Sequence, residues 1–332
     1  MSNVVLSGSK LNVFSKCSWI YYATYILGIR SEGNSGSRRG SVVHVVFDCL
    51  LSKRRKKYVD KILNDKTIKN CLPVLKLVQR LSEKNNLGEI DNKDQNNLDL
   101  IDSMIVTGLG LDFYCEGGNL EKAETQFSYK GDGYEIRGAI DKIAKYDENY
   151  KIFDYKSSSN KYKGEESEFN EQSLIYSLWF YRLYGVIPFF RFIFLRFEGD
   201  PFIDKYYTEN EIKGFEEYLI YITKYLEDFD LKKGMSNMAA DKGYPKDGSF
   251  SGLTSCGYAK YPGHVSAKTG KEYWACSYKF KKTYYYIFDD KQEVKYVTDK
   301  PEKITEEEWK NVKTMEYAGC PAWNRDKYDF VK

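Results

Sequence analysis

The chain has 332 residues, which is enough for one large domain or two and for a full hydrophobic core. Its 51 basic and 48 acidic residues leave a net charge of +3, so overall charge indicates neither a basic nor an acidic partner. There is no run of about 18 apolar residues and no basic-then-apolar N-terminal leader. We therefore expect a soluble, cytoplasmic protein that does not interact with a membrane.

Three further features narrow the class of protein. Seven cysteines spread over a long chain do not resemble a secreted disulfide framework. No Gly-x-x-x-x-Gly-Lys-Ser/Thr motif occurs, so the sequence contains no recognisable ATP motor. His44 and His264 are the only histidines, which leaves little room for a Ser-His-Asp hydrolase.

The first 118 residues are predicted to be mainly helical. An apolar stripe indicates an N-terminal helix over residues 5–30, and Gly/Ser-rich residues 31–40 indicate a loop. A helix over 41–58 buries its apolar face and carries His44 one turn from its start. Two more helices are expected over 67–87 and 95–114. A lone histidine on an apolar helix is more often a core residue than a ligand.

The following stretch is predicted to form a sheet. Strands are expected over 121–129, 134–143 and 151–156, with turns at 131–133 and 146–149. Asp154 and Lys156 share one strand face because they are two residues apart, and symmetric closure of the second turn places Asp141 opposite Asp154. Two carboxylates and an ammonium on one patch suit a divalent cation and an anionic reacting group. Charged residues on a solvated strand face would produce the same pattern.

The rest of the chain divides near residue 233. A polar, basic loop over 157–163 precedes a helix over 165–184, which carries Gln172 and Tyr176 on one face. A buried strand over 189–197 and an amphipathic helix over 208–230 follow. From about residue 233 the sequence is rich in loop residues and punctuated by glycine.

Taken together, these pieces resemble the RecB-type branch of the PD-(D/E)XK nuclease superfamily, and are similar to the CRISPR adaptation and AddB-type exonucleases. The resemblance covers about residues 5–197, and its motifs appear in the family's order: GSVVH, RGAIDKI, IFDYKS and QSLIYSLWFYRLYG. It implies an α/β, restriction-endonuclease-like core with a mixed central sheet flanked by helices. We expect this core over 1–232, with a helical insertion over about 60–118, and a loop-rich extension over 233–332 that packs on the core.

The resemblance also implies a site for hydrolysis of DNA. Asp141, Asp154 and Lys156 are the expected catalytic residues, with Lys156 positioning or deprotonating the attacking water and neutralising charge. One or two Mg²⁺ or Mn²⁺ ions would be held by four groups: His44, Asp141, Asp154 and the backbone carbonyl of Tyr155. Three residues are expected to support the site or bind DNA: Arg39, Gln172 and Tyr176. Glu124 occupies a strand position where many relatives have a glutamate, but a solvated carboxylate is the favoured interpretation.

The late cysteines pose a separate question. Several RecB-type nucleases hold a [4Fe–4S] cluster with one cysteine before the core and three after it, and four cysteines here repeat that order: Cys17, Cys256, Cys276 and Cys320. The spacing departs from the family, because the last three are closely clustered there. Zinc at Cys256, His264 and Cys276 and ordinary thiols are the alternatives.

The functional hypothesis is a metal-dependent deoxyribonuclease, acting as an exonuclease on single-stranded DNA or duplex ends in replication, recombination or repair. Its source would be prokaryotic or phage-like, and a separate helicase or recombination protein is an expected partner. Two alternatives stay open. One is a non-catalytic nucleic-acid-binding module on a degenerate nuclease fold. The other is a nuclease subunit that acts only with a helicase or within a CRISPR adaptation complex.

Overall fold

The computed structural model describes residues 4–29, 34–91, 94–111, 113–115, 117–164, 169–239 and 256–324. The chain forms two compact units. The first unit comprises Met1–Gly8 and Gly33–Lys224, and the second comprises Ser9–Glu32 and Tyr225–Lys332. The second unit thus combines an N-terminal segment with the C-terminal hundred residues. The domain boundary expected after residue 232 stays a prediction.

A six-stranded mixed sheet forms the centre of the first unit. Its strands are β1 (Val5–Leu6), β2 (Asn119–Lys130), β3 (Glu135–Tyr146), β4 (Asn149–Lys156), β5 (Phe189–Phe194) and β6 (Phe202–Lys205). The order is β1-β3-β4-β5-β6, and β2 also pairs with β3. The β1–β3 and β4–β5 pairs are parallel and the others antiparallel, which confirms the mixed sheet expected from the sequence.

The β3–β4 hairpin has the register predicted from its turn. Tyr146 pairs with Asn149, and Lys142 pairs with Phe153. Side chains alternate along β4: Tyr155 is buried, and its ring lies 4.7 Å from that of Phe47 in the helical layer. Residues 154 and 156 therefore project from the opposite face of this strand.

Four helices cover one face of the sheet: α3 (Ser35–Ser52), α4 (Lys56–Asp65), α5 (Leu72–Lys84) and α6 (Asn97–Leu109). Their apolar residues form one core with the buried face of β4. The loop expected over 31–40 is wrong for residues 35–40, because the Asn34 side chain accepts the Ser37 N–H and starts α3 there. Residues 31–33 lie outside the described part. The helix expected to reach residue 58 ends at Ser52, and Arg54 has a positive φ of 44°.

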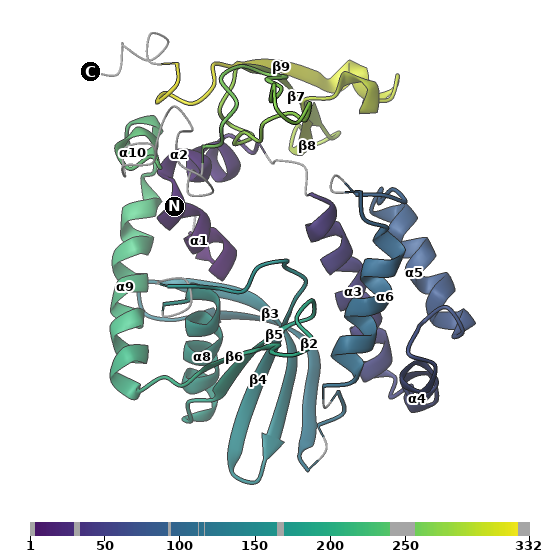
Figure 1. Cartoon of the computed structure of the whole chain (residues 1–332). Coiled ribbons are helices and arrows are strands. Elements are labelled where there is room, and N and C mark those ends of the chain that lie inside the picture. The colour runs from purple at the N-terminus through teal and green to yellow at the C-terminus, as the bar shows by residue number, and fades with distance from the viewer. Residues whose placement is uncertain are drawn as a thin grey trace. The chain divides into compact units, whose positions relative to one another are not determined.

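Helix α8 (Glu171–Tyr184) covers the other face of the sheet, followed by α9 (Glu209–Glu227) (Figure 1). Asn170 caps α8 by accepting two backbone N–H groups, and Gly185 ends it with a φ of 72°. The helix was expected to begin at Glu165; residues 165–168 lie outside the described part, and α8 begins at Glu171. The strand expected over 189–197 ends at residue 194, and β6 was not predicted.

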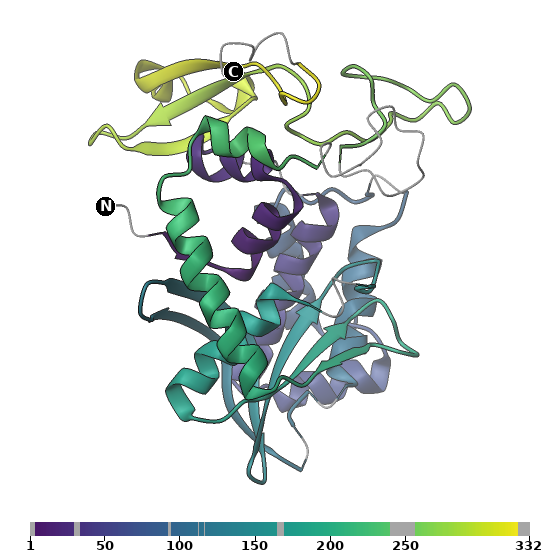
Figure 2. The ribbon, with the colours of Figure 1, turned by 90° about the vertical axis from the view of Figure 1, so that its left-hand side faces the viewer.

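The prediction of a single helix over residues 5–30 is wrong. Its residues instead form β1, which belongs to the first unit, then α1 (Gly8–Lys16), α2 (Ser18–Tyr21) and a π-helical turn (Tyr22–Ile26). Cys17 has an extended backbone that separates α1 from α2. Helix α2 lies beside α10 (Leu231–Ser236), as Figure 2 shows, and the Ser18 hydroxyl donates to the Gly234 carbonyl over 2.9 Å.

The C-terminal region is more ordered than its loop-rich sequence predicted. It contains an antiparallel sheet of β7 (Lys282–Phe288), β8 (Val294–Thr298) and β9 (Val312–Tyr317) in the order β8-β7-β9, with short 3₁₀ helices at Pro301–Lys303 and Glu308–Asn311. The predicted loop residues 240–255 lie outside the described part. None of the described helices is long and apolar enough to cross a membrane.

Buried aromatic residues join the two parts of the second unit. The Trp19 indole donates to the Tyr317 hydroxyl over 2.6 Å, and that hydroxyl donates to the Tyr278 carbonyl over 2.8 Å. The Tyr278 hydroxyl donates in turn to the Ile29 carbonyl over 2.9 Å. Segments more than 200 residues apart in sequence therefore share one core.

Candidate active site

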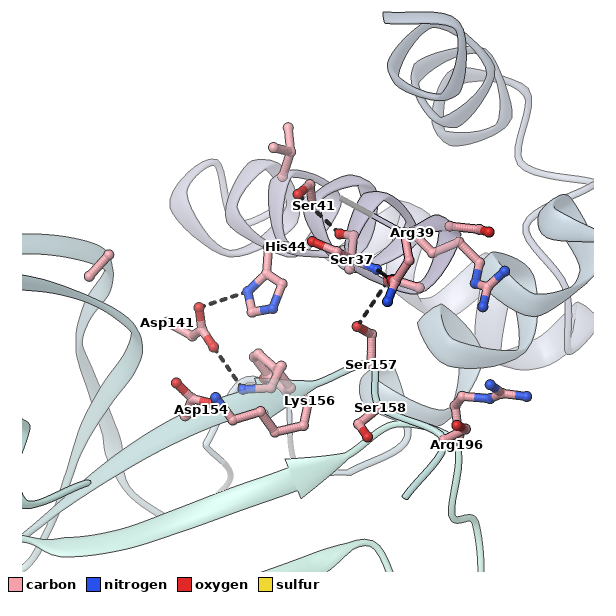
Figure 3. A pocket seen from close by; sticks show the side chains of 18 of the residues that line it. Ser37, Arg39, Ser41, His44, Asp141, Asp154, Lys156, Ser157, Ser158 and Arg196 are labelled. Atoms are coloured by element: carbon pink, nitrogen blue, oxygen red, sulfur yellow. Dashed lines mark hydrogen bonds and ion pairs between the residues drawn. The ribbon is translucent and has the colours of Figure 1, made fainter. Parts of the chain in front are cut away.

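A cavity of about 840 Å³ opens in the first unit, where α3 begins and β4 ends (Figure 3). Its lining includes the first three turns of α3, the loop after β4 and the start of α8. The cavity brings together most of the residues that the sequence assigned to catalysis and metal binding: Arg39, His44, Asp141, Asp154, Tyr155, Lys156 and Gln172.

His44 and Asp141 form the first contact in this cavity. Nδ1 of His44 lies 2.8 Å from Oδ1 of Asp141, and Oδ2 of Asp141 accepts the Tyr155 N–H over 2.7 Å. Burial lowers the pKa of His44, but the Asp141 carboxylate outweighs that effect and raises the pKa to about 9. Since Nδ1 faces Asp141, Nε2 is the nitrogen that could bind a metal ion, and it would have to release its proton to do so.

Asp154 and Lys156 form a buried ion pair beside this contact. Nζ of Lys156 lies 2.6 Å from Oδ2 of Asp154, and their side chains are 18% and 4% exposed. Burial alone would lower the pKa of Lys156, but the Asp154 carboxylate raises it above its usual range. Burial raises the pKa of Asp154, an effect that Lys156 opposes and Asp141 reinforces. A protonated Lys156 can neutralise negative charge but cannot accept a proton from water.

Gln172 and Tyr176 hold this pair in place. Gln172 accepts a hydrogen bond from Lys156 Nζ over 2.6 Å and donates through Nε2 to Oδ1 of Asp154 over 2.7 Å. The same Nε2 lies 2.9 Å from the Tyr176 hydroxyl, which donates to the Ala139 carbonyl over 2.7 Å. The four-residue spacing that put both side chains on one helix face therefore connects α8 to β3 and β4.

Glu124 is the residue that sequence reasoning underrated. His44, Glu124 and Asp141 each offer one ligand atom, and these atoms all lie within 4.8 Å of one another. Glu124 lies between the register pairs Ala123–Lys142 and Thr125–Ile140, opposite Asp141. Its φ of +39° is strained for an L-residue, a feature that concentrates at functional sites. The predicted 131–133 turn would have hidden this signal, because its symmetric closure places residue 124 opposite residue 140. The observed pairing of Lys130 with Glu135 shifts the register by one and places residue 124 opposite residue 141.

Arg39 is engaged inside the protein. Its guanidinium donates through Nη1 to Oδ2 of Asp91 over 3.0 Å and to Oδ1 of Asn97 over 2.6 Å, and the residue is buried. These bonds hold α3 against the segment before α6. They use Nη1 of a guanidinium that also lines the cavity, so a contact between Arg39 and DNA stays a prediction.

Close approach of α3 to the loop after β4 depends on Gly40. A Cβ at this position would lie 2.5 Å from the Ser157 hydroxyl oxygen, so a larger residue would force the Ser157 side chain to turn away. The first turn of α3 consequently lines the same cavity as Ser157 and Lys156 (Figure 3). The positive end of the helix dipole favours anions there. The Tyr155 residue also lines the cavity, and ligation by its carbonyl stays a prediction.

The second unit contains a separate cysteine pocket. Four cysteines that are far apart in sequence line it together, alongside Lys279 and several apolar residues: Cys17, Cys256, Cys276 and Cys320. Burial raises the pKa of both Cys276 and Cys320 to about 12. All seven cysteines lie in the described part of the chain, and none is in a disulfide.

The surroundings of this pocket bear on the metal alternatives. The Lys279 side chain is buried, and its Nζ donates to the Gly257 carbonyl over 3.0 Å. Burial lowers the pKa of Lys279, and the neighbouring thiols oppose that shift. His264 does not line the pocket, since its ring packs between Tyr261 and Tyr273. The structure therefore does not bring His264 together with Cys256 and Cys276 as the zinc alternative required.

Comparison with known proteins places this fold and site in a class. The profile of the PD-(D/E)XK nuclease superfamily matches residues 5–232, which is more than half of the chain. The chain belongs to the PD-(D/E)XK nuclease superfamily. A solved structure from Eubacterium rectale, an exonuclease by provisional assignment, has a TM-score of 0.44 and 12% identity, covering 68% of this chain and 80% of that chain. No curated protein matches the chain.

Proposed function

We propose that the protein is a metal-dependent deoxyribonuclease of the RecB-type branch that degrades DNA from its ends. Membership of the nuclease superfamily supports hydrolysis of a nucleic-acid phosphodiester. The observation that carries the proposal is the cluster of His44, Glu124 and Asp141 next to the buried pair of Asp154 and Lys156. Oxygen and imidazole ligands of this kind suit Mg²⁺ or Mn²⁺.

Each side chain then has a definable role. His44 Nε2 and the carboxylates of Glu124 and Asp141 would hold the ion, which when bound polarises a phosphoryl oxygen and lowers the pKa of a water molecule. Asp141 also orients the His44 ring through Nδ1 and fixes the β4 backbone through the Tyr155 N–H. Asp154 would complete the ligand set from the adjacent strand.

Lys156 would act on charge rather than as a base. Its ammonium is buried beside Asp154, and the Gln172 amide fixes both groups. A fixed cation stabilises negative charge that builds on the phosphorus in the transition state. The N-terminus of α3 adds backbone N–H groups to the same cavity, and Arg196 in its lining supplies a further cation for a DNA phosphate.

Cleavage of end-labelled linear and circular DNA, with Mn²⁺ and with EDTA, tests this proposal. Asp141→Asn and Glu124→Gln should reduce the rate by at least about a hundredfold and weaken Mn²⁺ binding measured by calorimetry. Glu121→Gln is the matched control, because this exposed glutamate lies on the same strand outside the ligand cluster. It should behave like the wild-type chain.

The same substrates separate the alternatives. An exonuclease degrades linear DNA and spares covalently closed circles, whereas an endonuclease cuts both. DNA binding without any cleavage would support a non-catalytic module. Activity that appears only after a helicase or CRISPR adaptation protein is added would support a partner-dependent subunit. Normal cleavage and Mn²⁺ binding by Asp141→Asn would refute the proposed site.

We further propose that the cysteine pocket of the second unit holds a metal centre, with a [4Fe–4S] cluster as the expected occupant. Four cysteines are the common ligand set for such a cluster, and here they converge from four separate stretches of chain. The raised pKa values of Cys276 and Cys320 disfavour thiolates in the unloaded pocket. Coordination to a bound metal would stabilise the thiolates despite their burial. The Lys279 ammonium would offset the negative charge of a thiolate-ligated cluster.

A further inference from the structure

A hairpin of the second unit can be followed in Figure 2. Apart from the Gly257 carbonyl that Lys279 contacts, its residues line neither of the two sites described above. We call residues 257–275 the aromatic hairpin. Its arms are joined by backbone hydrogen bonds from Tyr258 N–H to the Trp274 carbonyl and from Tyr273 N–H to the His264 carbonyl, each 2.8 Å long. Ser266 N–H donates to the Lys271 carbonyl over 2.9 Å at the tip. The segment therefore has a defined shape.

Aromatic rings gather on this hairpin and remain open to solvent. The His264 ring lies 4.7 Å from the Tyr261 ring and 4.8 Å from the Tyr273 ring. Trp274 is 59% exposed, Tyr261 58% and Tyr273 38%. Rings that only filled a core would be buried, so these large apolar surfaces remain available for another molecule.

The orientation of Trp274 is constrained by the opposite arm. Gly257 has a φ of +75°, and a Cβ at that position would lie 2.6 Å from Cε3 of the indole. The indole thus rests on the backbone of a glycine, with one side supported and more than half of its surface exposed. A supported ring loses little conformational freedom when another flat group stacks on it.

The charge of the hairpin favours a polyanion. Lys260, Lys268 and Lys271 are exposed, and Glu272 is the one acidic residue between positions 257 and 275. With His264 neutral, the nineteen residues carry a net charge of +2. Exposed rings combined with lysines are the surface on which single-stranded nucleic acids bind, because bases stack on the rings while phosphates contact the ammonium groups.

We propose that the aromatic hairpin binds single-stranded DNA, with unpaired bases stacked on Trp274, Tyr261 and Tyr273. Bases in a duplex are already stacked on one another, so this surface favours single strands over double strands. The inference rests on the proposed nuclease function for its choice of DNA, and adds a substrate-binding surface outside the active-site residues. A protein partner would also use exposed rings, but the excess of lysine favours the phosphate-bearing ligand.

Fluorescence anisotropy of the full chain with a labelled oligothymidine tests the proposal. EDTA prevents cleavage, so binding is measured alone. The competitors are a duplex of the same length and an abasic strand that retains every phosphate but no base. We expect single strands to bind much more tightly than either competitor. Trp274→Leu should weaken binding about 5- to 150-fold, the range for loss of one stacked base, and Trp274→Phe should restore most of the affinity.

Matched variants separate stacking from charge and from folding. Trp309 is 45% exposed in the same unit but outside the hairpin, so Trp309→Leu should bind like the wild-type chain. Lys271→Gln should lower the slope of log affinity against log salt by about 0.7 for one lost phosphate contact. Circular dichroism of Trp274→Phe and Trp274→Leu shows whether both variants retain the fold.

Several results would overturn the inference. Equal affinity for the abasic strand would exclude base stacking, and unchanged binding by a folded Trp274→Leu variant would exclude this hairpin. Absence of any nucleic-acid binding by the wild-type chain would also overturn it and favour a protein partner. Because binding is measured in EDTA, these outcomes are independent of cleavage. Cleavage that needs Asp141, with binding indifferent to Trp274, would refute the hairpin role and leave the nuclease proposal intact.

Discussion

Replacing Asp154 with asparagine should destabilise the first unit far more than the same change at Asp141. Asp154 neutralises a lysine whose side chain is only 18% exposed, and the carboxylate itself is 4% exposed. Removing one partner of a buried ion pair costs about 3–5 kcal/mol, because the other charge stays buried and unpaired. Lys156 keeps its Gln172 partner, so we expect about 3 kcal/mol, or a fall of roughly 6–12 °C in Tm.

Asp141 has a different surrounding. An asparagine there can still accept the Tyr155 N–H through its amide oxygen. His44 can also lose its proton once the Asp141 carboxylate is gone, so no charge is stranded. At about pH 10, where His44 has lost its proton in the wild-type chain as well, we expect a loss of about 1 kcal/mol or less. Near pH 7 the loss also includes the attraction that raises the pKa of His44 to about 9.

Urea unfolding in EDTA at about pH 10, followed by circular dichroism, measures the difference, because His44 is then neutral while Lys156 keeps its charge. A double-mutant cycle with Asp154→Asn, Lys156→Met and the combined variant isolates the pair. The combined variant should be clearly more stable than Asp154→Asn alone, because it contains no buried unpaired ammonium. Strictly additive losses, or an Asp154→Asn variant as stable as Asp141→Asn, would refute the reasoning.

Two further predictions concern other parts of the molecule. Burial raises the pKa of Glu216, but Arg182 and Tyr134 outweigh it and hold the pKa below 4.5. Glu216→Gln should therefore lower the free energy of unfolding by about 1 kcal/mol at pH 7, a figure discounted for the exposure of Arg182. The difference from wild type should vanish as pH falls through the lowered pKa of Glu216. A pH-independent difference would contradict this prediction. Anaerobically purified protein should contain about four irons per chain and absorb visible light. Cys320→Ser should lose iron and Cys71→Ser should retain it, whereas zinc or no metal would refute the cluster.

The predicted turns were the best guide to the site in the sequence, because a turn determines which residues of its two strands lie opposite each other. Closure about Asp147 and Glu148 gave the β3–β4 register, because a two-residue turn fixes which residues face each other. The same reasoning applied to the predicted 131–133 turn places Glu124 opposite Ile140 and misses it, because the real turn closes about Asp132 and Gly133. Glu124 lies on a strand that mixes polar and apolar residues, so a solvated carboxylate was a sufficient explanation of its presence. The distances between ligand atoms in the structure reveal its proximity to His44.

The sequence could not show which residues far apart in the chain lie together in the fold. The wide gaps between the late cysteines argued against a shared site, yet the fold brings all four to one pocket. The β7 strand, KTYYYIF, has the aromatic and β-branched composition of a strand, but glycine-rich neighbours obscured it. Similarly, the apolar stripe of residues 5–30 indicated one helix, because nothing local reveals that Cys17 is extended.

The composition of the second unit has a consequence for synthesis on the ribosome. Trp19 emerges early, but its hydrogen-bond partner Tyr317 lies almost 300 residues later in the chain. At about 5–20 residues per second, the N-terminal aromatic segment waits roughly 15–60 s for its core. The first unit can complete its sheet during that interval, since β6 ends at Lys205. A nascent chain that stalls before β9 would thus present a folded sheet together with uncovered tryptophan and tyrosine side chains, which is the kind of surface that chaperones bind.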